Sequence, residues 1–140
     1  MRSLGFDLGT KNLGVAISDN LGLIANPLET LKFASTTGLI DPVSKLLEEY
    51  EVDAIALGLP KNMDGSEGFA AERSLKFKEL LEANFDVKIV LVDERLSTVE
   101  AEKYLLDADM SRKKRKSHID AVAASVILNT YLRMKGKENE

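Results

Sequence analysis

Apolar residues alternate with small or polar residues over roughly the first 33 positions of the chain. This two-residue period is typical of strands that bury one face, and it recurs in three segments separated by turn-forming residues. We therefore expect a hairpin of two strands joined by 9–12, followed by a third strand over 24–33. Pro27 places this third strand at an edge of the sheet or at a bulge. The alternating apolar residues of the hairpin are Leu4, Phe6, Leu13, Val15 and Ile17.

Helical patterns and continuous apolar runs alternate along the rest of the chain. Apolar residues spaced three to four apart predict helices, and unbroken apolar runs predict strands that are buried on both faces. Strands connected by helices run parallel to one another. The pattern thus predicts an α/β fold in which three antiparallel strands are followed by two parallel ones. The predicted helices span 37–50, 69–83, 97–106 and 117 onward, and the predicted strands span 53–60 and 87–92.

The apolar spacing also predicts which face each helix buries. Phe69 is expected on the buried face of its helix, together with Phe77 and Leu81. For the last helix the expected buried stripe comprises Ile119, Val122, Ala123, Val126, Ile127 and Tyr131.

The composition indicates one compact domain over residues 1–140. With 44% hydrophobic and 30% charged residues, a chain of this length can bury a core but is short for two full domains. It has no Cys, which excludes disulfides and thiolate metal sites. No apolar run approaches the roughly 18–20 residues of a membrane helix, and no signal peptide is evident. We expect a cytoplasmic protein without a membrane partner.

Positive charge is concentrated towards the C-terminus, although the net charge is −4. Residues 1–102 carry 10 Lys or Arg against 18 Asp or Glu, a net of −8, whereas residues 103–140 carry 9 against 5, a net of +4. We expect a flexible basic loop over about 109–116 and a disordered tail over about 135–140. The basic run is either a solvated segment or a patch that binds a polyanion. It consists of Arg112, Lys113, Lys114, Arg115 and Lys116.

Polar residues follow the ends of several predicted strands. Asp7 ends the first strand, a loop follows Pro60, and Asp93 and Glu94 end the fifth strand. Ligands of α/β sheets bind at the carboxyl ends of the strands, so these residues can converge on one site. From the residues alone, Asp7 could hold a turn, contact the phosphates of a nucleotide or bind a metal ion.

Four segments carry a resemblance to a known family: FDLGTKNLGVAISD (6–19), ALGLPKNMDGSEG (56–68), DERLSTVEAE (93–102) and HIDAVAASVILNTYL (118–132). In this order they resemble the YqgF-type nucleases, a branch of the ribonuclease-H-like superfamily related to Holliday junction resolvases. The resemblance covers nearly the whole chain. It implies a five-stranded mixed sheet flanked by helices, metal-dependent cleavage of structured nucleic acid, and a role in processing the 5′ end of precursor 16S rRNA.

The resemblance also implies that Asp7, Glu94 and Asp120 are the catalytic residues and the metal ligands. Mg²⁺ and Mn²⁺ are hard cations that prefer oxygen ligands. Two such ions about 3.5–4 Å apart stabilise the attacking and leaving oxygens of a phosphodiester displacement. We therefore expect Mg²⁺ or Mn²⁺ as the cofactor, in a two-metal site.

Each of the three acids has a structural alternative. Asp7 could accept hydrogen bonds from the amides of its turn. Asp93 lies beside Glu94, and alternation along a strand sends the two side chains to opposite faces, so only one can point at the site; we favour Glu94. Asp120 would cap the helix backbone if the helix began at Ser117, because it would then lie in the first turn.

Further side chains are candidates for contacts with the substrate. Arg95 could clamp a phosphate or pair with a neighbouring acid, and Asn62 lies in a loop near the strand ends. The basic run at 112–116 completes this set. His118, the only histidine, is left outside the catalytic set.

The favoured function is a nuclease that acts on RNA in preference to DNA, as a monomer or a weak homodimer. The alternatives are a Holliday junction resolvase, an inactive nucleic-acid-binding module of the same fold, and an ATPase of the actin or sugar-kinase type. The ATPase needs a second domain to close over the nucleotide, which 140 residues do not supply.

Overall fold

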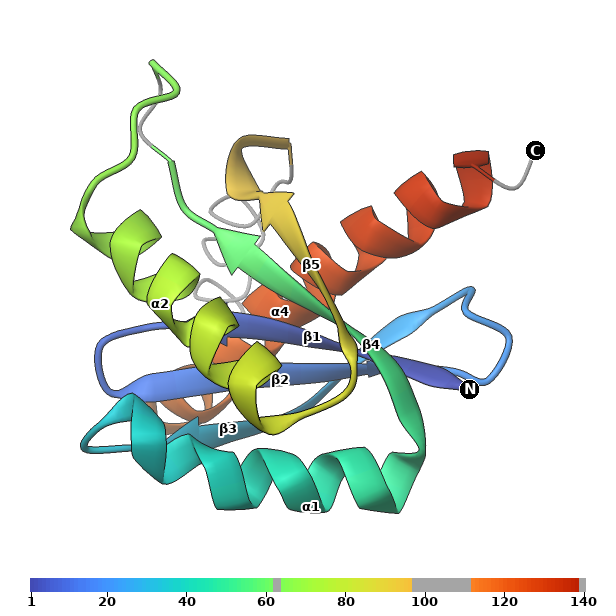
Figure 1. Ribbon diagram of the computed structural model, residues 1–140, viewed down its shortest axis with the longest axis horizontal. Coiled ribbons are helices and arrows are strands. Elements are labelled where there is room, and N and C mark those ends of the chain that lie inside the picture. Colours follow the sequence, from blue (N-terminus) through green and yellow to red (C-terminus); the bar gives the residue numbers. More distant parts are fainter. Residues whose placement is uncertain (62–63, 97–111, 139–140) are drawn as a thin grey trace.

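A computed structural model of the chain describes residues 1–61, 64–96 and 112–138, with the backbone alone described for residues 96, 112–118 and 137–138. Five strands form one sheet: β1 (Arg2–Leu8), β2 (Asn12–Ser18), β3 (Ala25–Lys32), β4 (Val52–Leu59) and β5 (Lys88–Asp93). Their order across the sheet is β3-β2-β1-β4-β5 (Figure 1). The first three strands pair antiparallel, and β4 pairs parallel with both β1 and β5. The predicted five-stranded mixed sheet is therefore confirmed.

The predicted turn at 9–12 and the predicted edge position of Pro27 are both present in the structure. Leu8 pairs with Leu13, and the amide of Gly9 donates to the carbonyl oxygen of Asn12 at 2.9 Å, which closes the turn between β1 and β2. β3 lies at the edge of the sheet, and its register with β2 shifts next to Pro27. The shift leaves Leu28 without a partner on β2, next to Pro27, which pairs with Ala16 and has no amide to donate.

Two of the predicted helices, at 37–50 and 69–83, follow their predicted spans with small differences at their ends. η1 (Thr36–Leu39) leads into α1 (Ile40–Tyr50), α2 (Phe69–Asn84) connects β4 to β5, and η2 (Glu94–Leu96) follows β5. α4 (Arg112–Glu138) is the last described helix. No helix within the described part of the chain is long and apolar enough to cross a membrane.

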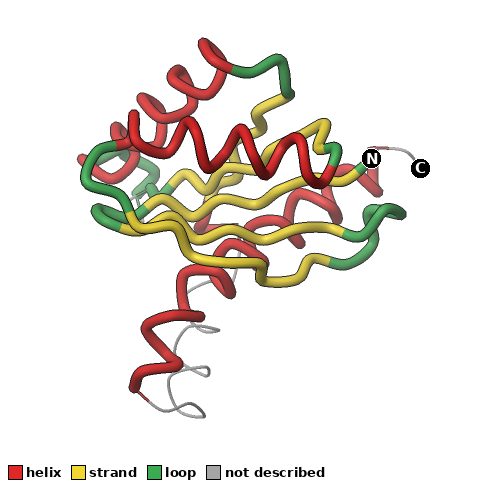
Figure 2. Tube along the Cα trace, turned by 90° about the horizontal axis from the view of Figure 1, so that it is seen from below, coloured by secondary structure: helices red, strands yellow, loops and turns green. Residues whose placement is uncertain are grey.

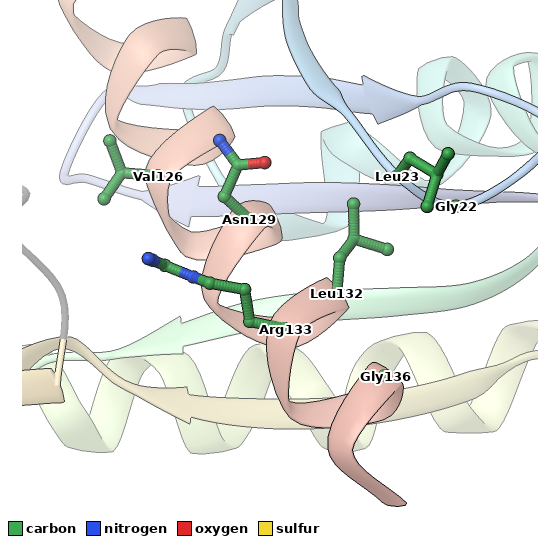
Figure 3. Close-up of a pocket in the computed structure, with 7 residues that line it drawn as sticks. All are labelled: Gly22, Leu23, Val126, Asn129, Leu132, Arg133 and Gly136. Carbon is green, nitrogen blue, oxygen red and sulfur yellow. The ribbon is translucent and has the colours of Figure 1, made fainter. Parts of the chain in front are cut away.

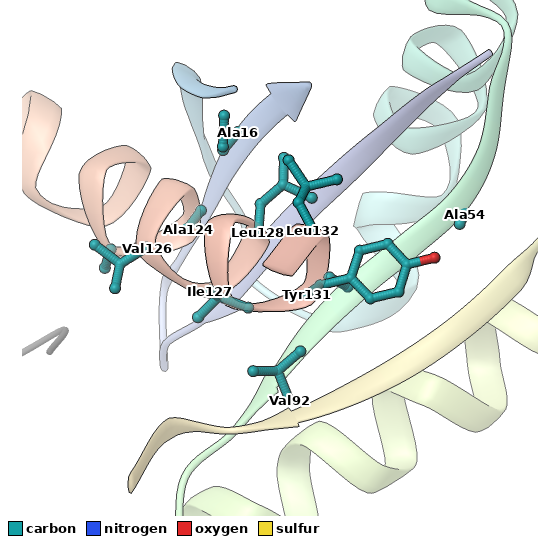
Figure 4. Close-up of a cluster of buried hydrophobic side chains, with 12 residues drawn as sticks. Ala16, Ala54, Val92, Ala124, Val126, Ile127, Leu128, Tyr131 and Leu132 are labelled. Atoms are coloured by element: carbon teal, nitrogen blue, oxygen red, sulfur yellow. The ribbon is translucent and has the colours of Figure 1, made fainter. Parts of the chain in front are cut away.

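Side chains are sorted by size between the two faces of the sheet. One face carries Leu, Ile, Val and Phe side chains that pack with α1 and α2, where the rings of Phe6 and Phe77 lie 6.2 Å apart. The other face carries mainly small residues, and α4 packs against it (Figures 2 and 4). This cluster contains Ala16, Ala25, Ala54, Ala56 and Val92 from the strands and Ala123, Ala124, Val126, Ile127, Leu128, Tyr131 and Leu132 from α4.

The start and end of α4 correct two predictions. Residues 112–116 of the predicted basic loop and residues 135–138 of the predicted tail are helical. Lys and Arg are good helix formers, and neither Gly nor Pro interrupts 112–135, so charge alone was a poor guide to a loop here. The rest of the predicted loop, at 109–111, and the predicted helix at 97–106 lie outside the described residues.

The prediction for Phe69 is wrong, since 84% of its surface is exposed. The buried stripe of α2 runs back from Leu81 through Phe77 and Ser74 to Ala71. Phe69 precedes Ala71 by two residues, which is more than half a turn around the helix axis. It therefore points away from the sheet.

Candidate active site at the carboxyl ends of the strands

Asp7 lies in the middle of a row of residues that crosses the sheet. It pairs with Gly14 of β2 on one side. On the other side, Phe6 pairs with Leu57, so Asp7 is level with Gly58 of β4. Asp7 shares its face of β1 with Gly5, which contacts α4, so the half-buried Asp7 side chain belongs to the α4 face.

Gly14 allows the backbone of α4 to approach this row. A side-chain carbon at Gly14 would overlap the carbonyl group of Asp120 and would lie 3.0 Å from the amide nitrogen of Ala121. Asp120 is therefore held against the strand position that is paired with Asp7. The glycine is required here by a close approach of two backbones rather than by a turn.

Gly58 makes room for Glu94 on the opposite side of Asp7. A Cβ built on Gly58 would lie 2.8 Å from Oε1 of Glu94. The half-buried Glu94 thus reaches the α4 face from η2, directly after the end of β5. The three predicted acids consequently reach one row from three separate elements: β1, η2 and α4.

Asp93 has a different environment from Glu94. Val90 and Val92 of β5 pack in the cluster under α4, whereas Ile89 and Leu91 pack in the cluster under α1 and α2. Alternation places Asp93 on the second of these faces, and its carboxylate there forms a 2.7 Å ion pair with Nη2 of Arg95. The hydrogen bond from Arg95 lowers the pKa of Asp93, and the same contact raises the pKa of Arg95.

The position of Asp120 excludes the capping alternative. α4 begins at Arg112, so Asp120 lies more than two turns inside the helix. A carboxylate at this depth cannot satisfy the orphan amides of the first turn. Asp120 is half-buried beside the sheet, where a charged group needs a polar or ionic partner.

The residues predicted to contact the substrate do not share one place in the structure. Arg95 pairs with Asp93 in the structure, and the described contacts leave it on the face opposite to Glu94. Asn62 lies outside the described residues. The five basic residues Arg112, Lys113, Lys114, Arg115 and Lys116 form the first turns of α4, ahead of Asp120 on the same helix.

The residues fit a metal ion by their chemistry, although the acids are not gathered around one point. Among the described residues, no group of three or more His, Asp or Glu side chains is arranged to hold a metal ion. Asp7, Glu94 and Asp120 nevertheless offer only carboxylate oxygens, the ligands that Mg²⁺ and Mn²⁺ prefer. Gly14 and Gly58 place no side chain of their own beside Asp7, where the backbone of Asp120 and the side chains of Glu94 and Ile127 approach the sheet.

A cavity of about 480 Å³ lies at the other end of α4, away from this row (Figure 3). It is bounded by the turn between β2 and β3 and by the second half of the helix. Its only charged lining residue is Arg133, so it offers no set of groups for phosphodiester chemistry. The lining residues are Gly22, Leu23, Val126, Asn129, Leu132, Arg133 and Gly136.

Gly14 is the residue that the sequence interpretation missed. A glycine in the interior of a predicted strand often marks a close approach of another backbone, and NLGVA contains such a glycine. That signal could have identified Gly14 as a contact point. The identity of the helix that contacts it could not have been read from the strand.

Comparisons with known proteins agree with this architecture. A family model described as "RuvX: Holliday junction resolvase" matches residues 1–134. A "Putative pre-16S rRNA nuclease" of Geobacillus sp. (strain WCH70) is 51% identical over 137 residues, covering 96% of this chain and 99% of that protein. The Bacillus subtilis (strain 168) protein of the same name is 49% identical over 134 residues, covering 94% and 97%.

Solved structures of low sequence identity share the fold. T. thermophilus RuvC in complex with Holliday junction substrate matches with a TM-score of 0.59 at 13% identity, covering 96% of each chain. The Fowlpox virus resolvase with Holliday junction DNA matches with a TM-score of 0.52 at 15% identity, covering 96% of this chain and 99% of that one. These likenesses confirm the predicted ribonuclease-H-like fold.

Proposed function

This chain belongs to the RuvX family, and from that premise we propose that it is a metal-dependent nuclease that processes the 5′ end of precursor 16S rRNA. Relatives about half identical over almost their full lengths bear the name of a pre-16S rRNA nuclease. The family model matches residues 1–134, a range that contains Asp7, Glu94 and Asp120. RNA is therefore the substrate class that we favour.

The observation that carries this proposal is the row across the sheet in which Asp7 lies between two glycines. Gly14 brings the backbone at Asp120 to one side of Asp7, and Gly58 makes room for Glu94 on the other. A strand, a turn and a helix thus each contribute one acid to the same edge of the sheet. Acids on rigid elements can be held within the small tolerances that catalysis requires.

We assign the binding of Mg²⁺ or Mn²⁺ to the carboxylates of Asp7, Glu94 and Asp120. When bound between such carboxylates, divalent cations stabilise the developing charge on the attacking and leaving oxygens of a phosphodiester. The chain itself contributes the fixed positions of the acids. Asp7 is held by its pairing with Gly14 of β2 and by its neighbour Phe6, which pairs with Leu57 of β4. Asp120 is held by the helix that packs across the strands.

The first turns of α4 provide a candidate contact for the phosphate backbone. The residues at 112–116 are all basic and precede Asp120 by four to eight positions on one helix, which is about 6–12 Å along its axis. Successive phosphates on one strand of a stacked duplex rise about 3.4 Å along the axis, so this distance corresponds to roughly two to four nucleotides. We propose that this segment holds the strand while the acids act on one of its phosphates.

Cleavage of Holliday junctions is the second candidate. It is favoured by the description of the family model, "RuvX: Holliday junction resolvase", and by the fold shared with RuvC. A resolvase cuts two strands that are related by a two-fold axis, so it acts as a dimer. Cleavage of one RNA strand needs only a monomer or a weak homodimer.

The test compares substrates and acid variants in one assay. Purified protein is incubated with precursor 16S rRNA, single-stranded RNA and a four-way DNA junction, with Mg²⁺, Mn²⁺ or a chelator. We expect cleavage of the precursor RNA with either metal and none with the chelator. Asp7→Asn, Glu94→Gln and Asp120→Asn should each lose cleavage by orders of magnitude, and double variants should be little worse than single ones.

Asp53→Asn is the matched control, because this exposed acid lies at the amino end of β4, far along the strand from Gly58. It should cleave as the parent does. All variants should melt normally in metal-free buffer, with free energies of unfolding within about 1 kcal/mol of the parent. Cleavage in the presence of chelator, or a folded Asp7→Asn variant as active as the parent, would contradict the proposed site. Preferential cleavage of the junction would favour the second candidate.

A further inference from the structure

The carboxylate of Asp93 fixes the turn that presents Glu94. Its Oδ1 accepts a hydrogen bond from the backbone amide of Arg95 at 3.0 Å, and its Oδ2 accepts from Nε and Nη2 of Arg95 at 3.1 and 2.7 Å. The same carboxylate therefore holds both the backbone of η2 and the direction of the guanidinium. Glu94 stands between these two residues and points to the opposite face, where it reaches Gly58.

The guanidinium of Arg95 also meets the loop that connects β4 to α2. A Cβ built on Gly65 would lie 3.3 Å from Nη1 of Arg95, and the φ of Gly65 is +89°, which favours glycine. The preceding residue, Asp64, attracts Arg95 electrostatically and accepts hydrogen bonds from the amide and hydroxyl of Ser66 at 2.9 and 2.6 Å. Arg95 thus lies between the loop after β4 and the turn after β5.

This arrangement pairs the guanidinium within the protein. Asp93 engages Nε and Nη2, and Nη1 lies near Gly65, while the side chain of Arg95 stays 34% exposed. A phosphate that used the planar fork of Arg95 would have to displace Asp93, whose ion pair already has the geometry of a strong charge-assisted hydrogen bond. Removal of that carboxylate would release both the loop and the turn.

We infer that Asp93 and Arg95 are positioning residues, which hold Glu94 in the place where it can bind a metal ion. The inference rests on the proposed function, because it acts through the role of Glu94 there. It also separates two neighbouring acids: Glu94 binds the cation, and Asp93 orients Glu94 through Arg95. Partners that orient a metal-binding side chain typically change metal affinity or activity by about 10–100-fold when they are mutated.

Two variants test the inference from opposite ends of the ion pair. Asp93→Asn keeps an acceptor for the amide of Arg95 but removes the charge, and Arg95→Lys keeps the charge but removes the planar fork. In both we expect Mn²⁺ affinity, measured without nucleic acid, and kcat to fall about 10–100-fold, with KM for nucleic acid little changed. Amide hydrogen exchange at residues 64–66 should become faster, because the loop loses its anchor.

A phosphate contact at Arg95 makes different predictions. Arg95→Lys would then retain most binding, and Arg95→Gln would weaken binding and lower the slope of log K against log salt by about 0.7–0.9. With Arg95 as a positioning residue, we expect the salt slope of Arg95→Gln to equal that of the parent. A lowered slope together with normal Mn²⁺ affinity would overturn the inference.

Glu82→Gln is the matched control. It removes one carboxylate from the 3.0 Å ion pair with Lys78 on the exposed side of α2, and it should leave Mn²⁺ affinity, kcat and exchange unchanged. A parent protein that neither binds Mn²⁺ nor cleaves overturns the proposed function and the positioning role with it. If the parent binds Mn²⁺ and cleaves, and Asp93→Asn matches it in Mn²⁺ affinity, kcat and amide exchange, the positioning role alone is overturned.

Discussion

At the scale of single residues, two glycines set how closely α4 approaches the sheet. Gly14 contacts the backbone of Asp120, and a Cβ built on Gly5 would lie 2.6 Å from the carbonyl oxygen of Ala124 and 2.7 Å from Cβ of Leu128. Both positions forbid a side chain for the same steric reason. They differ in that only Gly14 contacts a residue that we assign to metal binding.

Gly14→Ala is predicted to impair cleavage beyond its effect on stability. The added methyl group must push the helix away from β2 at Asp120, and a misplacement of about 1 Å at a catalytic site can cost on the order of 10²-fold in rate. Overpacking should also lower the free energy of unfolding by about 1–3 kcal/mol. Urea unfolding and cleavage assays, at a temperature where the variant is fully folded, measure the two effects separately.

Gly5→Ala is the control for this comparison. It should lower stability by a similar amount, because it meets α4 about one turn further along, but it should retain most of its cleavage rate. Equal cleavage rates for the two folded variants would contradict a special role for the contact between Gly14 and Asp120.

At the scale of elements, α4 combines three parts in one helix: the basic run at 112–116, Asp120, and a second half that is almost entirely buried from Ala121 to Leu132. Replacement of all five basic residues by Gln keeps a helix-forming sequence and removes the charge. Binding should weaken across nucleic-acid sequences, and the slope of log K against log salt should fall by up to about 0.7–0.9 for each lost phosphate contact.

The opposite end of the same helix provides the control for the salt experiment. Arg133 and Lys135 are exposed there, beyond the sheet and away from the acids. Their replacement by Gln removes positive charge from α4 and should leave the salt slope unchanged. If the five-residue variant also keeps the parent slope, the basic run is only a solvated face of the helix.

Local patterns were sufficient to predict most elements but not the contacts between them. The period of two identified β1 and β2, and Pro27 correctly indicated an edge strand with a shifted register. The start of α4 was misjudged because a run of like charges suggests a loop, whereas helix propensity and the packing of the following turns favour a helix.

The candidate site was predictable only in part, because local patterns place its residues on elements but do not bring those elements together. Asp7 and Glu94 lie at or next to the ends of β1 and β5, and alternation alone separates Asp93 from Glu94. The approach of Asp120 to Gly14 joins residues that are 106 positions apart, and no local pattern encodes such a contact. The misplaced helix start also made Asp120 resemble a capping residue, an interpretation that the structure excludes.

At the scale of the whole molecule, the sheet separates two cores with different consequences for mutation. The core under α1 and α2 contains large side chains such as Phe6, Phe77 and Leu81, and it is separated from the acids by the sheet itself. The core under α4 adjoins the row that contains Asp7. Damage to the first core should therefore reduce stability without a direct effect on the acids.

Phe77→Ala tests this separation. Phe77 is 1% exposed and packs on Phe6, so its truncation should lower the free energy of unfolding by about 3–5 kcal/mol. Cleavage per folded molecule, measured well below the melting temperature, should stay close to that of the parent. A large loss of kcat in the folded variant would show that the two cores are coupled through the sheet.

The packing of α4 on the first three strands has a consequence for the order in which the protein matures. Strands β1 to β3 end at Lys32, but the helix that covers their small-residue face begins at Arg112. During synthesis, α1 and β4 can pack on the early strands while the small-residue face of β1 to β3 is still uncovered. That face is covered only when α4 packs on it, a contact between segments at opposite ends of the chain. The backbone at Asp120 meets Gly14, the strand partner of Asp7, only in this last step. On our assignment of the acids, a nascent chain therefore completes its candidate active site only after α4 has left the ribosome.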